Sequence, residues 1–272
     1  PDSLRRLDLH ARQVPLSEML SVASRNFQLA IQLAQLEFTE AIAAVANAVK
    51  FDEEAARALF TRYLTGYVAA ALLMPYGRFL RACEATGYDL PVLERRFGVS
   101  FEQLGHRLTT LQRVGQRGLP FFMVRIDRAG QFSKTFIGAS TARFVESGAS
   151  CPLWHAHRAF DRAGELQVQF VALDNSGDRD GGWLTMARTV EGSGAPGEAQ
   201  FVVVLGVEAV LANELAQARG VSLRTDDAQP IGPGCARCHR IQCSQRSLPP
   251  IGRKLTFDRV RRGVTPFEFT RD

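Results

Sequence analysis

The sequence predicts an α+β protein, with a helical first half followed by a mainly antiparallel sheet and a cysteine-rich end. Three observations predict this class. Apolar residues recur at helical spacing up to about residue 114, and β-branched and aromatic segments separated by turn residues follow. Three cysteines then fall close together near the end of the chain. We therefore expect a helical scaffold at 1–114, an α+β domain at 115–230, and a cysteine-rich tail at 231–272 packed on that domain.

Composition permits a well-packed core and argues against membrane insertion. The chain has 272 residues, of which 46% are hydrophobic, and a net charge of +5. It has no apolar run close to the 18 or so residues that a membrane span needs, and its first residues are charged, unlike a secretory leader. We expect a cytoplasmic protein with reduced or metal-bound cysteines. Because the chain begins with Pro1 rather than Met, we also expect it to be a piece of a longer protein.

Capping and breaking residues divide the first half into helices. Ser17 and an apolar series that runs to Phe38 predict the first helix. The acidic residues 52–54 suit the positive end of the next helix, which must stop before Pro75. Ser100 is a plausible cap for a later helix. Three shorter helices are expected at 79–84, 91–97 and 101–111.

The pattern changes to strands after the glycines at 115–118. Turn residues at 175–182 and 192–197 separate several of these segments, and a helix is expected at 208–219. The predicted strands are 121–126, 131–137, 166–173, 183–190 and 201–205.

The cysteines suggest a metal site. Cys235, Cys238 and Cys243 form a Cys-x2-Cys-x4-Cys run, and thiolates at this spacing can converge on one soft metal centre. Cys151, in Cys-Pro-Leu-Trp, is the expected fourth ligand. Spacing alone leaves open a structural zinc ion, an iron–sulfur cluster or unligated thiols. His239 is expected to be a surface residue rather than a ligand, and the fifth cysteine, at position 83, a small core residue.

The tail is also basic. From Cys235 onward there are nine Arg or Lys residues against three Asp or Glu. Three interpretations are open: a solvated surface, cations that offset an anionic cluster, or contact with nucleic acid.

Several segments together resemble one bacterial family. They are residues 69–76 (Ala-Ala-Ala-Leu-Leu-Met-Pro-Tyr), residues 101–113, the Cys-Pro-Leu-Trp at 151–154, and the cysteine run with Arg246 and the following Pro-Pro. Their order resembles that of the short-chain fatty-acyl-responsive transcriptional regulators, which include propionate-catabolism and glyoxylate-bypass regulators. The resemblance covers nearly the whole chain.

The resemblance implies a non-enzymatic, dimeric regulator. Its effector would be a short-chain acyl-CoA such as propionyl-CoA, bound by an effector domain at 115–230, and its cysteines would hold a [4Fe–4S] cluster rather than zinc. DNA would be read only by an amino-terminal helix-turn-helix domain, for which this sequence has no room. No membrane partner is implied.

The helical half of this family resembles a zinc-peptidase fold whose active members carry His-Glu-x-x-His. That motif places two imidazoles on one helix face to bind zinc and a glutamate between them as general base. The matching stretch, residues 29–37, carries Ile31 and Gln35 at the histidine positions and Gln32 at the glutamate position. We expect a catalytically inactive scaffold.

An acyl-CoA carries several phosphates, and arginine suits bidentate contact with them. No glycine-rich phosphate loop is present, so side chains would supply the charge. Candidate cations bracket the end of the helical half and lie on the first hairpin, and candidate aromatics could wall an acyl pocket. Surface charge and core packing are the ordinary alternatives. The candidates are Tyr76, Arg107, Arg113, Phe121, Phe122, Arg125, Lys134, Trp154 and His157.

An enzyme is the remaining alternative, for example an acyl-CoA hydrolase using His155 or His157 as base near Cys151. A cysteine bound to a metal is no longer a free nucleophile, and no motif places a carboxylate to orient either histidine. A structural zinc module that mediates assembly is a third possibility.

Overall fold

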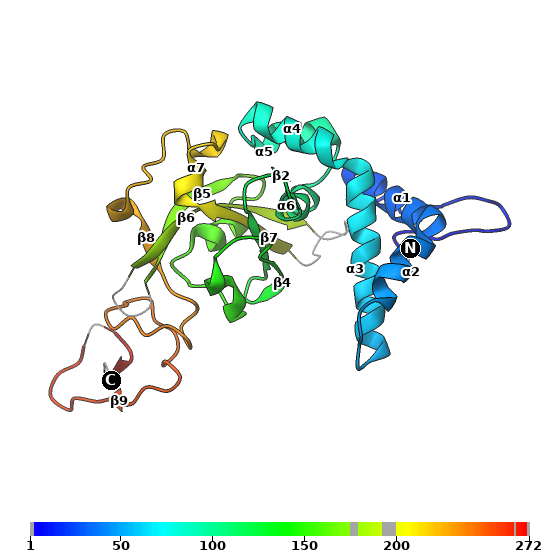
Figure 1. The fold of residues 1–272 in the computed structure, drawn as a ribbon. Helices are drawn as coiled ribbons and strands as arrows, with labels where there is room; N and C mark the ends of the chain where they lie inside the picture. The colour runs from blue at the N-terminus through cyan, green and yellow to red at the C-terminus, as the bar shows by residue number, and fades with distance from the viewer. Residues whose placement is uncertain (1–2, 175–178, 192–199, 264, 271–272) are drawn as a thin grey trace. The chain divides into compact units, whose positions relative to one another are not determined.

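The computed structural model describes the chain except for residues 1–2, 175–178, 192–199, 264 and 271–272 (Figure 1). It forms two compact units. The helical unit ends at Arg107, and the sheet unit begins at Leu108. Of the predicted turn at 175–182, residues 175–178 lie outside the described residues, and the rest is wrong, because residues 179–182 belong to a strand that pairs with its neighbour. The predicted turn at 192–197 also lies outside the described residues.

The helical unit follows the predicted pattern with one additional break. The first predicted helix is two helices that meet at Phe38 at an angle of 77°. Its cap is Ser21, whose hydroxyl accepts the Ser24 amide, rather than Ser17. The helices are α1 (Val22–Glu37), α2 (Thr39–Asn47), α3 (Glu54–Leu73), α4 (Tyr76–Thr86), α5 (Leu90–Phe97) and α6 (Phe101–Thr109).

Local sequence sets the helix ends. α3 stops just before Pro75, as predicted. Gly87 and Gly98 end α4 and α5 in the left-handed conformation that glycine adopts readily. Ser100 caps α6 reciprocally, because its hydroxyl accepts the Gln103 amide while the Gln103 side chain accepts the Ser100 amide.

A six-stranded, mainly antiparallel sheet forms the centre of the sheet unit, with the order β4-β3-β7-β6-β5-β8 (Figure 1). β8 runs parallel to its neighbour, β5, whereas β3 is antiparallel to β4 and β7, and β5 to β6. Two short pairs lie outside it, β1–β2 (Gln112–Arg113 with Gln116–Arg117) and β9–β10 (Leu255–Thr256 with Glu268–Phe269). The six strands are β3 (Phe122–Ile126), β4 (Phe132–Phe136), β5 (Gln167–Asp174), β6 (Arg179–Glu191), β7 (Gln200–Glu208) and β8 (Gln229–Ile231).

One face of this sheet carries an aromatic core. Phe144 meets Phe122, Trp154 and Trp183 edge-on, with ring centroids 5.1–5.9 Å apart. The Phe122 ring also covers Gly206, its partner on β7, so closely that a Cβ there would lie 2.3 Å from the ring. The Phe122 ring can therefore pack here only because residue 206 has no side chain.

The predicted helix at 208–219 is wrong beyond its first turn. α7 covers only Ala209–Ala212, and the chain leaves it at Asn213, a residue type that favours turns over helix interiors. Leu215 is then buried in the core.

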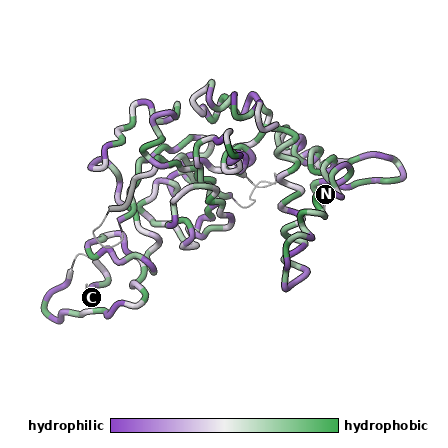
Figure 2. The backbone as a smooth tube through the Cα atoms, viewed as in Figure 1, coloured by the Kyte–Doolittle hydropathy of each residue, from purple (hydrophilic) through white to green (hydrophobic). Residues whose placement is uncertain are grey.

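No single helix among the described residues is long and apolar enough to cross a membrane; α1 and α2 would reach the length only as a sharply bent pair. Hydrophobic residues are distributed along these helices and along the strands of the sheet (Figure 2).

Candidate metal centre

Four cysteines line one pocket in the sheet unit. Cys235, Cys238 and Cys243 approach it from the tail, and Cys151 approaches it from the loop before β5. The structure therefore brings the distant sulfur to the tail triplet, although Cys151 and Cys235 are 84 positions apart in the sequence. The remaining lining residues are Pro152, Leu153, Gly232, Gly234, Arg240, Gln245 and Arg246.

Hydrogen bonds to two neighbouring strands position Cys151. Gln169 and Thr185 face each other across β5 and β6. The Trp154 indole N–H donates to the Thr185 hydroxyl (3.1 Å), and the His155 amide donates to Oε1 of Gln169 (2.8 Å). Thr185 in turn donates to the Gln169 carbonyl (3.1 Å). Because all these groups are buried or half-buried, the loop that carries Cys151 has a fixed place on the sheet.

Two glycines allow the tail to approach the pocket. A Cβ on Gly232 would lie 2.6 Å from the Cys238 sulfur. Gly234 has a φ of +86°, and a Cβ there would meet the Ala149 carbonyl oxygen at 3.1 Å. Larger residues would push residues 235–246, which we call the cysteine loop, away from Cys151.

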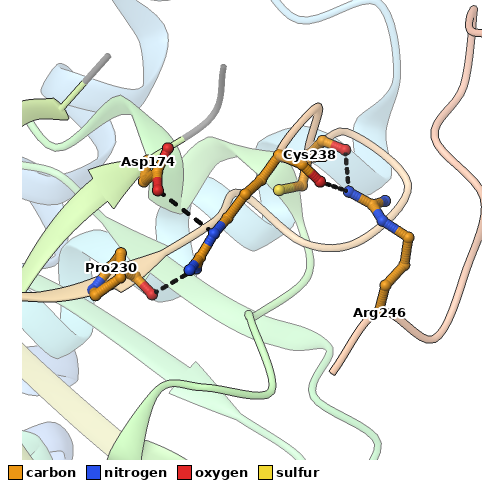
Figure 3. A network of polar contacts seen from close by, with 5 residues as sticks. Asp174, Pro230, Cys238 and Arg246 are labelled. Atoms are coloured by element: carbon orange, nitrogen blue, oxygen red, sulfur yellow. Dashed lines mark hydrogen bonds and ion pairs between the residues drawn. The ribbon is translucent and has the colours of Figure 1, made fainter. Parts of the chain in front are cut away.

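Arg246 organises the cysteine loop from inside. Its side chain is 3% exposed, and its guanidinium donates to the carbonyl oxygens of Cys238 and Arg240, both at 2.8 Å (Figure 3). It also donates to the carbonyls of Cys235 (3.0 Å) and Leu248 (3.3 Å). One cation thus holds the backbone on both sides of the central cysteine. Sequence reasoning noted this arginine in the motif but assigned it no role.

Two further features of Arg246 bear on the pocket. Its guanidinium lies over the Phe269 ring, 4.9 Å from the centroid. Its Nε is buried and has no hydrogen-bond partner among the residues that the structure describes. A buried cationic donor on the wall of a cysteine pocket suits an anionic group there, because unpaired buried charge is costly.

A second arginine fastens the tail to the sheet. Arg240 forms an ion pair with Asp174 at the end of β5 (3.4 Å) and donates to the Pro230 carbonyl on β8 (3.3 Å) (Figure 3). The cysteine loop is therefore tied to β5 and to β8, the strand from which the tail leaves the sheet.

The thiols combine burial with backbone donors. Burial raises the pKa of the Cys151 thiol, while the amides of Gly232 and Leu153 act in the opposite direction. Burial likewise raises the pKa of Cys238, against the Arg240 amide and the Arg246 charge. Amide donors to sulfur and nearby positive charge are the outer-shell features that stabilise thiolates bound to a metal centre.

The Cys235 sulfur also accepts a backbone hydrogen bond, from the Ser247 amide at 3.5 Å. Among the described residues, however, no three His, Cys, Asp or Glu side chains form a group that could hold a metal ion.

Two predicted ligand-binding cations are direct neighbours in the sheet unit. Arg125 on β3 pairs with Lys134 on β4. Arg125 donates to the Ser133 hydroxyl (2.9 Å) and lies 4.3 Å from the centroid of Phe201. The Lys134 side chain is exposed. The pair forms a small cationic area at one edge of the sheet.

The other predicted cations lie elsewhere. Arg107, in the helical unit, is 1% exposed and sits 5.7 Å from the ring centroids of both Tyr67 and Tyr76. Its Nε donates to the Met74 carbonyl (3.0 Å). This guanidinium has a packing role. Arg113, on β1, is exposed.

The predicted aromatics are core residues. Phe121, Phe122 and Trp154 are at most 2% exposed. His157 is half-buried, with Nε2 2.9 Å from the Ser150 hydroxyl, and burial lowers its pKa. It braces the loop that carries Cys151.

In the helical unit, the stretch that matches the peptidase motif lies on α1. Gln35, at the second histidine position, accepts a hydrogen bond from the Arg5 guanidinium (2.9 Å), and Arg5 also donates to the Gln28 carbonyl (3.0 Å). Gln32, at the glutamate position, is buried. A guanidinium next to these positions disfavours a metal cation there.

Comparison with known proteins gives consistent results along the chain. Residues 110–267 match the family described as short-chain fatty acyl coenzyme A regulator, C-terminal, and residues 1–109 match the IrrE N-terminal-like domain. A solved structure titled Mycobacterium tuberculosis transcriptional regulator superposes with a TM-score of 0.89 at 35% identity, over 98% of this chain and 81% of that one.

Curated relatives are named as regulators rather than enzymes. The HTH-type transcriptional regulator RamB of Mycobacterium tuberculosis is 38% identical over 97% of this chain and 56% of its own length. The propionyl-CoA carboxylase regulator of Cereibacter sphaeroides is 38% identical over 93% and 54%. The HTH-type transcriptional regulator PrpR of Mycobacterium tuberculosis is 35% identical over 99% and 56%. The chain thus spans a little over half the length of these relatives. With more than half of its residues matched by one family, it belongs to the short-chain fatty acyl coenzyme A regulators.

Proposed function

We propose that this chain is the effector-sensing region of a transcriptional regulator, and that it binds a short-chain acyl-CoA and carries a [4Fe–4S] cluster on Cys151, Cys235, Cys238 and Cys243. The observation that carries the cluster is the shared pocket of these four cysteines. The family description and the relatives' names support the acyl-CoA and the regulatory role.

The wall of the pocket supports an anionic, thiolate-bound metal centre. It combines backbone donors to sulfur with a buried cation, Arg246, whose Nε has no partner within the described part of the chain. When bound, a cluster would supply a one-electron redox centre and a link between Cys151 and the tail.

For the acyl-CoA, the neighbouring cations Arg125 and Lys134 are the leading candidates for phosphate contact. Arg113 is exposed and is a further candidate. Arg107, Phe121, Phe122 and Trp154 are buried, so any effect of theirs on the effector would act through packing. DNA binding would reside in a helix-turn-helix region of the longer protein, and a ligand that prefers one arrangement of a homodimer would shift its population.

The test is native mass spectrometry and visible absorption of anaerobically purified chain, with calorimetric titration of propionyl-CoA and of free CoA. We expect a brown protein that contains iron and sulfide and binds propionyl-CoA more tightly than CoA. A colourless protein with one zinc ion would favour the structural zinc module. Hydrolysis of the thioester on incubation would favour an enzyme.

A further inference from the structure

A second cluster of positive charge lies beyond the cysteine pocket, in the loop between β9 and β10. We call residues 257–262, Phe-Asp-Arg-Val-Arg-Arg, the tail arm. Arg259, Arg261 and Arg262 are exposed, and none of them forms an ion pair with any residue that the structure describes. The exposed apolar residues Phe257 and Val260 lie among these arginines in the sequence.

The tail arm is a built turn. Oδ1 of Asp258 accepts the amides of Val260 (2.8 Å) and Arg261 (3.0 Å), and these bonds lower its pKa. The only carboxylate of the arm is thereby engaged by the backbone. The turn presents Val260, which is 98% exposed, and Phe257, which is 81% exposed, among the three arginines.

The base of the tail arm is joined to the cysteine pocket. β9 and β10 pair on either side of the arm, with Leu255 opposite Phe269. Phe269 is buried beneath the Arg246 guanidinium, the group that organises the cysteine loop. The position of the arm therefore depends on the ordered cysteine loop.

We infer that the tail arm is a DNA-phosphate contact, additional to the helix-turn-helix region. This inference rests on the proposed regulatory function. Arginine suits phosphate oxygens geometrically, and exposed apolar side chains between cations can contact sugars and bases. A membrane surface is less favoured, because the arm is a short turn and not a long amphipathic helix. Since the arginines address phosphates, and apolar contact with sugars and base faces tolerates any sequence, the contact adds affinity without sequence preference.

The test is fluorescence anisotropy of the purified anaerobic chain with a labelled duplex of arbitrary sequence, over a salt series from about 50 to 200 mM. We expect weak, salt-dependent binding. The variant R259Q/R261Q/R262Q should flatten the slope of log K against log salt by about 2 to 3, as expected for three lost phosphate contacts.

A control variant removes the same charge elsewhere on the sheet unit. R143Q/R158Q/R219Q changes three arginines that are also exposed, and should leave the slope near that of the unmodified chain. Equal slopes for the two triple variants would overturn the inference. So would an unmodified chain that binds anionic vesicles of phosphatidylserine but not the duplex. Propionyl-CoA titration and visible absorption of the same samples report on the proposed function separately, so the two failures can be told apart.

Discussion

The two units treat a potential metal position in opposite ways. On α1 of the helical unit, the positions that hold zinc in active peptidases carry Ile31 and Gln35. The Arg5 guanidinium donates a hydrogen bond to the Gln35 side chain. In the sheet unit, four thiols from distant parts of the chain line one pocket. The first position has lost its donors and gained a cation, whereas the second collects soft donors and supplies them with N–H groups. The comparison teaches that donor chemistry, more than the surrounding fold, decides what a site can bind.

The largest expected effect comes from removing a cysteine. Cys238→Ser replaces a soft ligand with a hard one, and we expect bound iron to fall from about four atoms per chain to nearly none. Iron and sulfide assays with visible absorption measure this. Cys83→Ala is the matched control, because Cys83 is a fully buried core residue on α4 whose pKa burial raises to about 12. Equal iron loss in both variants would contradict a site made of these four cysteines.

Arg246→Gln tests whether the cysteine loop depends on the buried guanidinium. Because several carbonyl oxygens would lose a charged donor, we expect a loss of about 2–4 kcal/mol in the free energy of unfolding of the sheet unit. Urea denaturation measures it. Arg246→Lys should lose less, and Arg219→Gln, at an exposed arginine, should change stability little. A stability of Arg246→Gln equal to that of the exposed control would remove the organising role.

Two glycines compare packing in the two units. Gly206→Ala places a Cβ against the Phe122 ring and should destabilise the sheet unit by about 1–3 kcal/mol. Gly66, inside α3, has nothing within 4 Å of an added Cβ, so Gly66→Ala should stabilise the helical unit by about 0.5–1 kcal/mol. Thermal unfolding of each variant measures the two changes in stability, which we expect to have opposite signs. A destabilised Gly66→Ala would show that α3 packs more tightly than described.

The smallest effect is a pH dependence at His157. Burial lowers the pKa of His157, so the unfolded chain takes up its proton first, near its ordinary pKa of about 6.5. The contribution of this group to stability is present above about pH 6.5 and is lost as the pH falls through the folded pKa. Urea denaturation from about pH 7.5 to 5 should show a shallower decline for His157→Gln than for the unmodified chain. Parallel curves would assign the acid sensitivity to other groups, such as His155.

The sequence predicted the parts that depend on local chemistry. Helix stops at Pro75, the cap at Ser100 and the mainly antiparallel sheet follow from propensity and pattern, and the structure confirms them. It did not predict the break at Phe38, nor the early end of α7, after which Leu215 is buried in the core.

The candidate site divides in the same way. The cysteine spacing predicted that the thiols share one location, because thiolates so close in sequence can converge on one metal centre. The role of Arg246 could not be predicted, since its partners are backbone carbonyls that become neighbours only when the loop closes. The assignment of a DNA reader and of the domain boundaries at 114 and 230 stays a prediction.

The strand β8 has a consequence for how the molecule opens. It pairs with β5 over three residues at the margin of the sheet, and it is the point at which the tail leaves. A short outer strand exchanges its amide hydrogens far sooner than a central one. We therefore expect β8 and the tail to open locally, and their amides to exchange, while the central strands of the sheet stay paired.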